Sequence, residues 1–496
     1  MKKSKKINII LILCFIIMIT APLLFVNRIS GKVSESENRY LASFPKVFDE
    51  TTGKIDAKFP TGFKAWLNDN IGFRSFFMNL NNKINFKWFN EINNSNNKVV
   101  IGKDNWLFLM NDSSLADVQN ANLLSQEQID FYKNRYSEIT KYFKSLGTDL
   151  SITVFPQKSN MYSEYLPDNI LRINNESLID EMKDKFEGND NFDLNVPSDV
   201  LRKAKESRVI YSKAYDQSHW NNYGGFIGYT EIMKQAKKHI PNLKILTEDD
   251  FNITPYEKDT VLDGSKFTTE TDYDFKLKSE PTASSDKSFF DKINYKSNDP
   301  WKSYNYFVNK DKTLPKAIVV GDSYVWMFML NNMAESFSQL VFIHQLDIGN
   351  LNKIYSEVKP DIIIGAGLDN TVLGLADYQP PLINPTSEII SDNTPTEIKR
   401  GEKYNVDITV KNTSNEIWKK EKNVKLCIFQ NGVDYGYRLE IPDGKEIRPG
   451  EEYTFVLRDF QAPSNAESTY LEYQMVQEGV TYFGDKRRVD IKVDKK

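Results

Sequence analysis

The chain has 496 residues, of which 40% are hydrophobic and 27% are charged, ordinary proportions for a protein of two or three globular domains. Its 64 basic and 68 acidic residues are well mixed and give a net charge of −4, which does not favour nucleic acid as a partner. With two cysteines and three histidines the sequence shows no metal-ligand spacing, so we expect neither a metal nor another cofactor.

Residues 1–29 predict a basic cytoplasmic tail followed by a transmembrane anchor. Four lysines within Met1–Lys6 precede about 20 mostly apolar residues from Ile7 to Val26, a length that lets a helix cross a bilayer. Lysines ahead of such a segment stay in the cytoplasm. A cleaved signal peptide is the alternative, but no small-x-small site follows Ala21. We therefore predict a single-pass protein of the cell membrane whose domains after Arg28 are extracellular.

Residues 30–95 predict a tether and then a helical segment, because apolar residues such as Phe63, Trp66 and Leu67 recur at near-helical spacing. Residues 96–380 predict an α/β domain, since strand-like and helix-like segments alternate. In chain order we expect a hairpin at 99–108, helices at 126–146, 200–206 and 224–239, and strands at 149–155, 209–211, 317–320 and 361–364.

This alternation favours a mainly parallel sheet with flanking helices, in which reactive groups lie at the carboxyl ends of the strands. The charged stretch from 247 to 312 has few apolar runs and predicts a long excursion or a mobile lid. Residues 386–496 change in character and predict an all-β, Ig-like sandwich, with short alternating strands separated by turns such as Asn431-Gly432. This domain could bind a glycan or a partner, while Trp418 is expected in its core.

Ser323 is the candidate nucleophile. It follows the apolar run Ala317–Val320 in a Gly-Asp-Ser segment, at the carboxyl end of a predicted strand. A serine hydroxyl needs a base within hydrogen-bond reach before it can attack an acyl group. The same segment also fits a plain turn that caps a helix, so the serine alone is a weak signal.

His219 is selected as the base by elimination. His239 follows two lysines at a predicted helix end, where a cation meets the helix dipole, and His344 lies in a predicted strand. His219 instead has Asp216 three residues before it and opens a predicted helix. Asp216 would hold the imidazole tautomer and stabilise the imidazolium ion. The resulting hypothesis is a Ser-His-Asp acyl-transfer site.

The oxyanion formed in such a reaction would be bound by the backbone N–H of Ser323, aided by a group from residues 365–370. The candidates for oxyanion or substrate contact lie after predicted strands or beside the histidine and the serine, and they are Gly367, Asn370, Lys158, Tyr324 and Trp220.

Several segments of the chain resemble, in order, the segments of one known family. They are Glu37–Pro45, Asp69–Arg74, Ile101–Phe108, Phe155–Lys158 with Tyr162, Leu166 and Pro167, Asp216–Trp220 and Gly321–Ser323. Over about residues 35–375 the chain resembles the AlgJ/AlgX type of alginate O-acetylation proteins, a circularly rearranged SGNH-hydrolase-like family. The acid–histidine segment precedes the serine, the reverse of the order in most GDS-type serine hydrolases.

The resemblance implies that Ser323 accepts the acyl group, that His219 is the base and that Asp216 is its partner. The usual spacing in the family is D-x-H-W, whereas this chain has D-x-x-H-W, with Gln217 at the position of the acid. Either the loop bulges to deliver Asp216, or the third member of the triad is weakened.

Proteins of this family commonly work beside a multi-pass membrane O-acyltransferase that supplies acetyl groups. The resemblance therefore implies a membrane-anchored extracytoplasmic O-acetyltransferase, with the membrane acyltransferase as donor and a surface or secreted polysaccharide as acceptor. Two alternatives stay open from the sequence. One is an esterase that removes acetyl groups with the same residues, and the other is a non-catalytic scaffold or glycan-binding protein.

Overall fold

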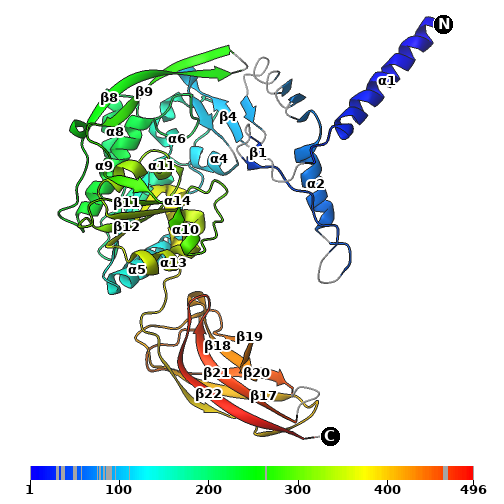
Figure 1. Cartoon of the computed structure of the whole chain (residues 1–496), viewed down its shortest axis with the longest axis vertical. Helices are drawn as coiled ribbons and strands as arrows, with labels where there is room; N and C mark the ends of the chain where they lie inside the picture. Colours follow the sequence, from blue (N-terminus) through cyan, green and yellow to red (C-terminus); the bar gives the residue numbers. More distant parts are fainter. Residues whose placement is uncertain are drawn as a thin grey trace. The chain divides into compact units, whose positions relative to one another are not determined.

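The computed structural model describes residues 2–28, 33–34, 39–48, 53–56, 58–74, 76–77, 80–81, 84, 92–94, 97–110, 112–262, 265–461 and 467–494. The chain forms two compact units, one of Met1–Lys133 with Leu150–Leu375 and one of Asn134–Asp149 with Ala376–Lys496. Figure 1 traces the helices and strands of both.

The N-terminal segment is helical from Lys2 to Leu24 (α1), and the side chains of residues 1–10 lie outside the described residues. Among the helices that the structure describes, none is long and apolar enough to cross a membrane. The transmembrane anchor within residues 1–29 stays a prediction from the sequence.

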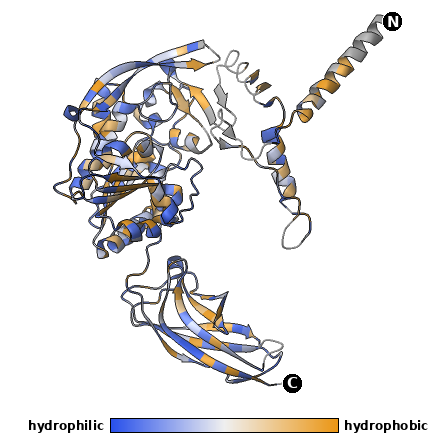
Figure 2. Cartoon of the chain, viewed as in Figure 1, coloured by the Kyte–Doolittle hydropathy of each residue, from blue (hydrophilic) through white to orange (hydrophobic). Residues whose placement is uncertain are grey.

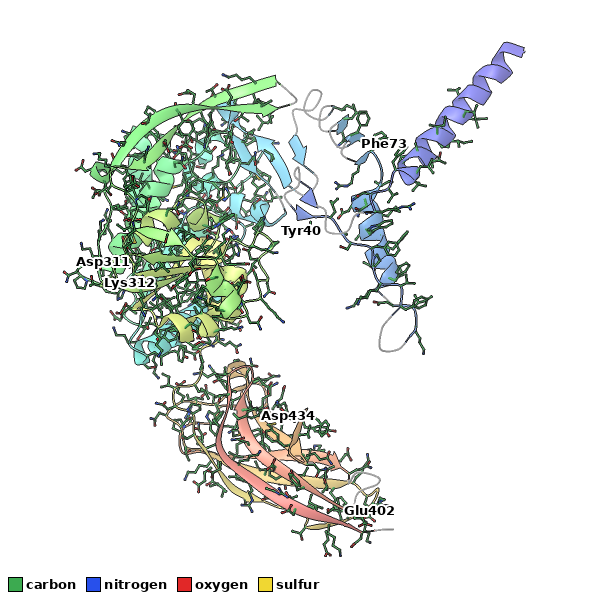
Figure 3. All side chains as sticks on the ribbon, in the orientation of Figure 1. Tyr40, Phe73, Asp311, Lys312, Glu402 and Asp434 are labelled. Carbon is green, nitrogen blue, oxygen red and sulfur yellow. The ribbon has the colours of Figure 1, made fainter. Side chains whose placement is uncertain are left out.

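The N-terminal segment that ends at Pro45 contacts the segment that begins at Asp69, two of the segments that resemble the family. β1 (Val33–Ser34) pairs with β2 (Arg39–Tyr40), and α2 spans Phe59–Asn70. Phe44 packs edge-on against Trp66 of α2 with ring centroids 4.9 Å apart. The Ala42 N–H donates to the Asp69 carboxylate at 2.8 Å. Figure 3 labels Tyr40 and Phe73 in this part of the chain.

The first unit is built around a seven-stranded sheet in the order β10-β11-β13-β12-β14-β6-β7. Its strands are β6 (Asp149–Phe155), β7 (Asp193–Asn195), β10 (Ala283–Ser285), β11 (Asn305–Asn309), β12 (Lys316–Gly321), β13 (Gln339–His344) and β14 (Ile362–Leu368). β12 pairs in parallel with β13 and β14, and β6 with β7, while β10 and β11 add an antiparallel edge. The predicted mainly parallel sheet is confirmed.

After α1 and α2, the described helices of this unit are α4 (Asp112–Val118), α6 (Lys158–Met161), α7 (Leu178–Phe186), α8 (Ser198–Ser207), α9 (Asn222–Lys237), α10 (Ser288–Lys292), α11 (Ser323–Trp326), α12 (Leu330–Ala334), α13 (Leu351–Val358) and α14 (Asp369–Gly374). The helix α5 (Gln126–Ser145) begins in this unit, and its residues from Asn134 on belong to the second unit. The last five residues of β12, Ala317–Gly321, are all buried. Because successive side chains of a strand point to opposite faces, both faces of the sheet are covered here, as expected for parallel strands between helices. This burial explains the unbroken apolar runs in the sequence.

The predicted hairpin at 99–108 is present, with β4 (Asn97–Ile101) antiparallel to β5 (Leu107–Leu109) and to β3 (Ile92–Asn94). The strand predicted at 209–211 is wrong. That segment instead turns back on itself, so that Tyr211 forms an isolated bridge with Trp220 and the Ser212 N–H donates to the His219 carbonyl.

Residues 251–277 form a long hairpin, with β8 (Phe251–Leu262) antiparallel to β9 (Ser265–Leu277). The long excursion predicted for 247–312 contains this regular hairpin, followed by β10, α10 and β11. The two strands of the hairpin could not be predicted, because most side chains of β8 are exposed and polar and leave no apolar period to read. At the base of the hairpin Phe275 stacks on Phe226 of α9, with centroids 4.9 Å apart. Near its tip Leu262 and Phe267 pack with the β4–β5 hairpin (Figure 1).

The second unit contains two sheets, β15-β17-β20 and β16-β22-β21-β18-β19. Their strands are β15 (Ser387–Asp392), β16 (Glu397–Lys399), β17 (Tyr404–Asn412), β18 (Val424–Gln430), β19 (Val433–Glu440), β20 (Glu452–Phe460), β21 (Ser468–Gln477) and β22 (Thr481–Asp494). Hydrophobic and hydrophilic residues alternate along several of them (Figure 2), and inward residues of both sheets share one core. The predicted sandwich is present, and Trp418 lies fully buried in that core.

Candidate active site

Ser323 lies at the carboxyl end of β12, where Asp322 caps the short helix α11 by accepting from the Tyr324 N–H at 2.9 Å. The Ser323 Oγ is 2.7 Å from the Nε2 of His219, which comes from a loop 104 residues earlier in the chain. β12 lies between β13 and β14 near the middle of the sheet, so the serine is mounted on a strand with two paired neighbours. The structure thus brings the predicted nucleophile and base into hydrogen-bond contact.

A turn in the loop delivers Asp216 to His219. One carboxylate oxygen of Asp216 accepts from the N–H groups of Ser218 at 2.8 Å and of His219 at 2.9 Å. This local turn folds the chain back, so that the other oxygen reaches the His219 Nδ1 at 2.9 Å. Of the two arrangements left open by the D-x-x-H-W spacing, the structure has the bulged loop.

Asp216 is held in its charged form. Burial would raise the pKa of Asp216, but the hydrogen bonds from His219 and Ser218 and the attraction of the imidazole hold it well below its usual value. A charged carboxylate on Nδ1 keeps the proton of a neutral imidazole on that nitrogen, which leaves Nε2 free to accept the proton of the serine hydroxyl. The arrangement can therefore perform nucleophilic acyl transfer.

The loop that carries Asp216 and His219 is held by hydrogen bonds from β5 and from the side chain of Lys158. The N–H groups of Leu107 and Leu109 in β5 donate to the carbonyls of Lys213 and Gln217. The Nζ of Lys158 donates to the carbonyls of Leu107 at 2.7 Å, Asp216 at 2.9 Å and Lys213 at 3.2 Å. These contacts tie the loop to the β4–β5 hairpin.

Residues 99–334 match the family model described as an SGNH hydrolase-like domain, acetyltransferase AlgX. This part of the chain is therefore similar to AlgX-type domains. No match was found among curated proteins. Ser323, His219 and Asp216 all lie within the matched range.

Solved structures with similar folds include PatB1 of Bacillus cereus, with 14% identity, a TM-score of 0.41, and coverage of 56% of this chain and 97% of that chain. A DHHW family protein from Eubacterium siraeum has 12% identity and a TM-score of 0.38, covering 58% and 97%. The O-acetyltransferase domain of Pseudomonas putida AlgJ has 14% identity and a TM-score of 0.31, covering 55% and 92%.

The other candidate residues of this domain take different places. Trp220 is 1% exposed and packs on Phe155 and Tyr324, so it supports the site from within the core. The hydroxyl of Tyr324 donates to the Ser218 carbonyl and thereby holds the histidine loop. Asn370 is exposed and lines a cavity of about 160 Å³ together with Ser218 and Tyr324.

Gly367 lies against Asp322, and a Cβ at this glycine would come within 2.7 Å of the Asp322 carboxylate. That carboxylate also accepts from the Leu368 N–H at 2.9 Å. The end of β14 is therefore hydrogen-bonded to Asp322, the residue before Ser323. Because the Leu368 N–H already donates to Asp322, it is not a free donor for the oxyanion. Burial raises the pKa of Asp322, against the opposing effect of these hydrogen bonds.

A buried pair of acids, Asp117 and Asp369, lies beside the same cavity and was not predicted from the sequence. The amide nitrogen of Gln157 donates to Asp117 at 2.7 Å and to Asp369 at 3.1 Å. Burial and the nearby charge of Asp117 raise the pKa of Asp369 to about 7. Gln157 and Asp369 each follow a strand, at the position where polar groups gather in such sheets, and this placement was the available signal.

Three glycines near the start of α9 allow its close packing behind the histidine. A Cβ at Gly224 would lie 1.9 Å from the Ile210 carbonyl oxygen, and one at Gly228 would lie 2.5 Å from the Trp220 ring. A Cβ at Gly225 would lie 2.6 Å from the Cβ of Phe328. Trp220 follows His219 in the chain, and the ring of Phe328 lies beside the His219 ring. The packing of the glycines against these two residues therefore helps to fix His219 relative to α11, the helix that begins at Ser323.

Lys158 provides a pH-dependent test of how the loop is held. Its burial lowers the pKa of Lys158 to about 7, although Asp216 and Glu270 attract the charge. Between about pH 7 and about pH 10.5 the unfolded chain binds the proton and the native state does not, so this residue makes stability rise with pH. We expect the free energy of unfolding of wild type, relative to Lys158→Met, to rise on the order of 4 kcal/mol across this window.

Urea unfolding of both proteins, followed by fluorescence across this pH range, measures the difference. A difference that stays constant with pH would show that the ammonium group titrates as it does in water. Lys213→Met is the matched control, because the Lys213 backbone carbonyl, and not its side chain, contacts the buried Nζ.

Proposed function

We propose that this protein is an extracytoplasmic O-acetyltransferase that moves an acetyl group through Ser323 to hydroxyls of a surface or secreted polysaccharide. The observation that carries the proposal is the 2.7 Å contact between the Ser323 Oγ and the His219 Nε2, with Asp216 on the other ring nitrogen at 2.9 Å. This geometry lies in the part of the chain that is similar to AlgX-type domains, and that family is one of SGNH hydrolase-like acetyltransferases.

In the first step His219 accepts the proton of the Ser323 hydroxyl as its oxygen attacks the acetyl carbonyl of the donor. The bond from the carbonyl carbon to the leaving group breaks, and His219 returns the proton to that group. An acceptor hydroxyl then attacks the acetyl–serine ester, with its proton again taken by His219 and delivered to the Ser323 oxygen. Asp216 stabilises the imidazolium ion in both steps, while the Ser323 N–H and the Asn370 side chain are candidate oxyanion donors.

The donor and the location follow from the sequence argument. A multi-pass membrane O-acyltransferase is the proposed source of acetyl groups, and a polysaccharide with free hydroxyls is the proposed acceptor. The lysine-led apolar segment of residues 7–26 supports export of the domain. Membrane attachment through that segment stays a prediction from the sequence.

Acetyl trapping on the full chain tests this proposal. The protein is mixed with p-nitrophenyl acetate, quenched in acid and digested, and we expect the peptide containing Ser323 to gain the mass of one acetyl group. His219→Ala, which keeps the serine but lacks the base, is expected to remain unlabelled over the same time. Absence of the adduct in wild type, or an adduct on another residue, would overturn the acyl-enzyme mechanism.

Adding acceptors separates transfer from hydrolysis. When polysaccharides with free hydroxyls are present, we expect acetyl to be recovered on the glycan, at the expense of free acetate. If all of the acetyl leaves as acetate whatever glycan is added, the same residues serve an esterase. A protein with no adduct and no turnover would be a binding or scaffold protein.

A further inference from the structure

The β8–β9 hairpin presents two buried carboxylates to the loop that carries the acid and the base. Glu270 and Asp272 lie two residues apart on β9, so their side chains point to the same face of the hairpin. Glu270 is 8% exposed and Asp272 is 1% exposed. Carboxylates are rarely buried in this way unless each oxygen has hydrogen-bond donors.

Glu270 holds the start of the loop. Its carboxylate accepts from the Ser212 hydroxyl at 2.5 Å and from the N–H groups of Ala214 at 2.6 Å and Tyr215 at 3.0 Å. The Ser212 hydroxyl oxygen in turn accepts from the Asp216 N–H at 2.8 Å. Glu270 is therefore connected to the backbone of the acid through one intervening hydroxyl.

Asp272 holds the other end of the loop. One of its oxygens accepts from the N–H of Asn222, the first residue of α9, at 2.9 Å. The other oxygen accepts from the Nζ of Lys258 at 2.7 Å, across the hairpin. Asp272 thus fixes the chain three residues after His219, at a helix N-terminus that favours a negative charge.

We propose that Glu270 and Asp272 are positioning residues that clamp both ends of the 212–222 loop and so set the contact between His219 and Ser323. This inference rests on the proposed function. The loop has little regular structure of its own, with an isolated bridge between Tyr211 and Trp220. Its geometry must come from neighbours, and charge-assisted bonds to backbone N–H groups are among the stronger hydrogen bonds available.

The opposite face of the hairpin offers matched controls. Glu257 and Asp259 are exposed carboxylates on β8, and they bond Thr271 at 2.8 Å and Thr269 at 2.7 Å within the hairpin. They share the hairpin and the charge of the clamp residues without contacting the loop. A change at Glu257 therefore reports what the loss of a carboxylate does to the hairpin itself.

We expect Glu270→Ala to lower kcat for p-nitrophenyl acetate by about 10- to 100-fold with KM nearly unchanged, since an error of about 1 Å in a catalytic group has effects of this size. Glu270→Gln keeps an acceptor oxygen and is expected to recover most of the loss. Asp272→Asn is expected to cost less than Glu270→Ala, because Asp272 contacts the loop through a single N–H. Glu257→Ala is expected to match wild type.

Combination with Asp216→Asn separates positioning from general stability. If the clamp acts through the acid and the base, the loss in Glu270→Ala with Asp216→Asn will be smaller than the product of the two single losses. Losses that multiply, or equal losses in Glu270→Ala and Glu257→Ala, would overturn the clamp.

A second measurement keeps the clamp testable if the protein lacks turnover. The chain has three histidines, so the full chain labelled with ¹⁵N-histidine gives few ring signals, and His219→Ala assigns one of them. We expect the Nδ1–H signal of His219 to be sharp in wild type and in Glu257→Ala, and broadened or shifted in Glu270→Ala. An unchanged signal in Glu270→Ala would reject the clamp, whereas missing turnover with a changed signal would reject only the proposed function.

Discussion

Replacing Ser323 by alanine is expected to reduce turnover of p-nitrophenyl acetate by at least about 10⁴-fold, to the residual rate that substrate binding and oxyanion stabilisation provide without a nucleophile. The hydroxyl that lies 2.7 Å from the His219 Nε2 is the only group lost, and it is the atom that must bond to the acetyl carbon. His219→Ala is expected to cause a loss of similar size. The double variant should be no worse than either single one, because the two groups act as a unit.

The matched controls are Ser207→Ala and His239→Asn. Ser207 is an exposed serine whose hydroxyl donates to the Ala204 carbonyl at the end of α8, and His239 pairs with Asp193 at 2.8 Å. Both are expected to retain wild-type turnover. Circular dichroism and thermal melts would show that the variants are folded. Turnover that persists in folded Ser323→Ala would place the acyl chemistry on another residue.

Asp216→Asn is expected to reduce kcat by about 10⁴-fold while the protein stays folded. Asparagine can still accept from the Ser218 and His219 N–H groups through its oxygen, so the turn is retained. Its amide N–H would then face the His219 Nδ1 and favour the tautomer that carries the proton on Nε2. That tautomer cannot accept the proton of Ser323, and the pH dependence of kcat would record the loss at every pH.

Gln217→Ala is the natural comparison, because glutamine occupies the position of the acid in the usual D-x-H-W spacing. Its carbonyl accepts from the Leu109 N–H, a backbone contact that alanine preserves. Gln217 lines the cavity beside Ser218 and Asn370, but the Nδ1 of His219 is already bonded to Asp216. We therefore expect the change in kcat to be less than about threefold. A larger loss in Gln217→Ala than in Asp216→Asn would show that the loop takes another conformation when it works.

The centre of the site could be predicted from the sequence because each of its parts is local. Ser323 lies three residues after the apolar run Ala317–Val320, and Asp216 and His219 lie within a stretch of four residues. The turn that joins Asp216 to His219 depends on bonds to two backbone N–H groups, which the D-x-x-H-W spacing permits without requiring. The spacing therefore left the acid open, and only the three-dimensional structure shows that the Asp216 carboxylate lies 2.9 Å from the His219 Nδ1.

The clamp residues could not be predicted, because nothing local distinguishes them. Glu270 and Asp272 stand in the stretch Thr268-Thr269-Glu270-Thr271-Asp272-Tyr273-Asp274, which has the composition of a solvated surface strand. Their burial comes from a loop about 50 residues earlier in the chain. The β8–β9 hairpin could not be predicted from the sequence for a related reason. Most side chains of β8 are exposed and polar, so the strand lacks the alternation of apolar residues that identifies a half-buried strand.

The packing glycines of α9 bear on how remote relatives of this domain could be recognised. A sequence pattern made only of Ser323, His219 and Asp216 would also match unrelated proteins that contain the same short motifs by chance. It would not require the histidine to be packed against a helix. The chain continues after His219-Trp220 with three residues and then the spacing G-G-x-x-G, where a methyl group would collide with its neighbours. Extending the pattern through these glycines adds a test of packing to a test of chemistry, using positions that are buried in the protein.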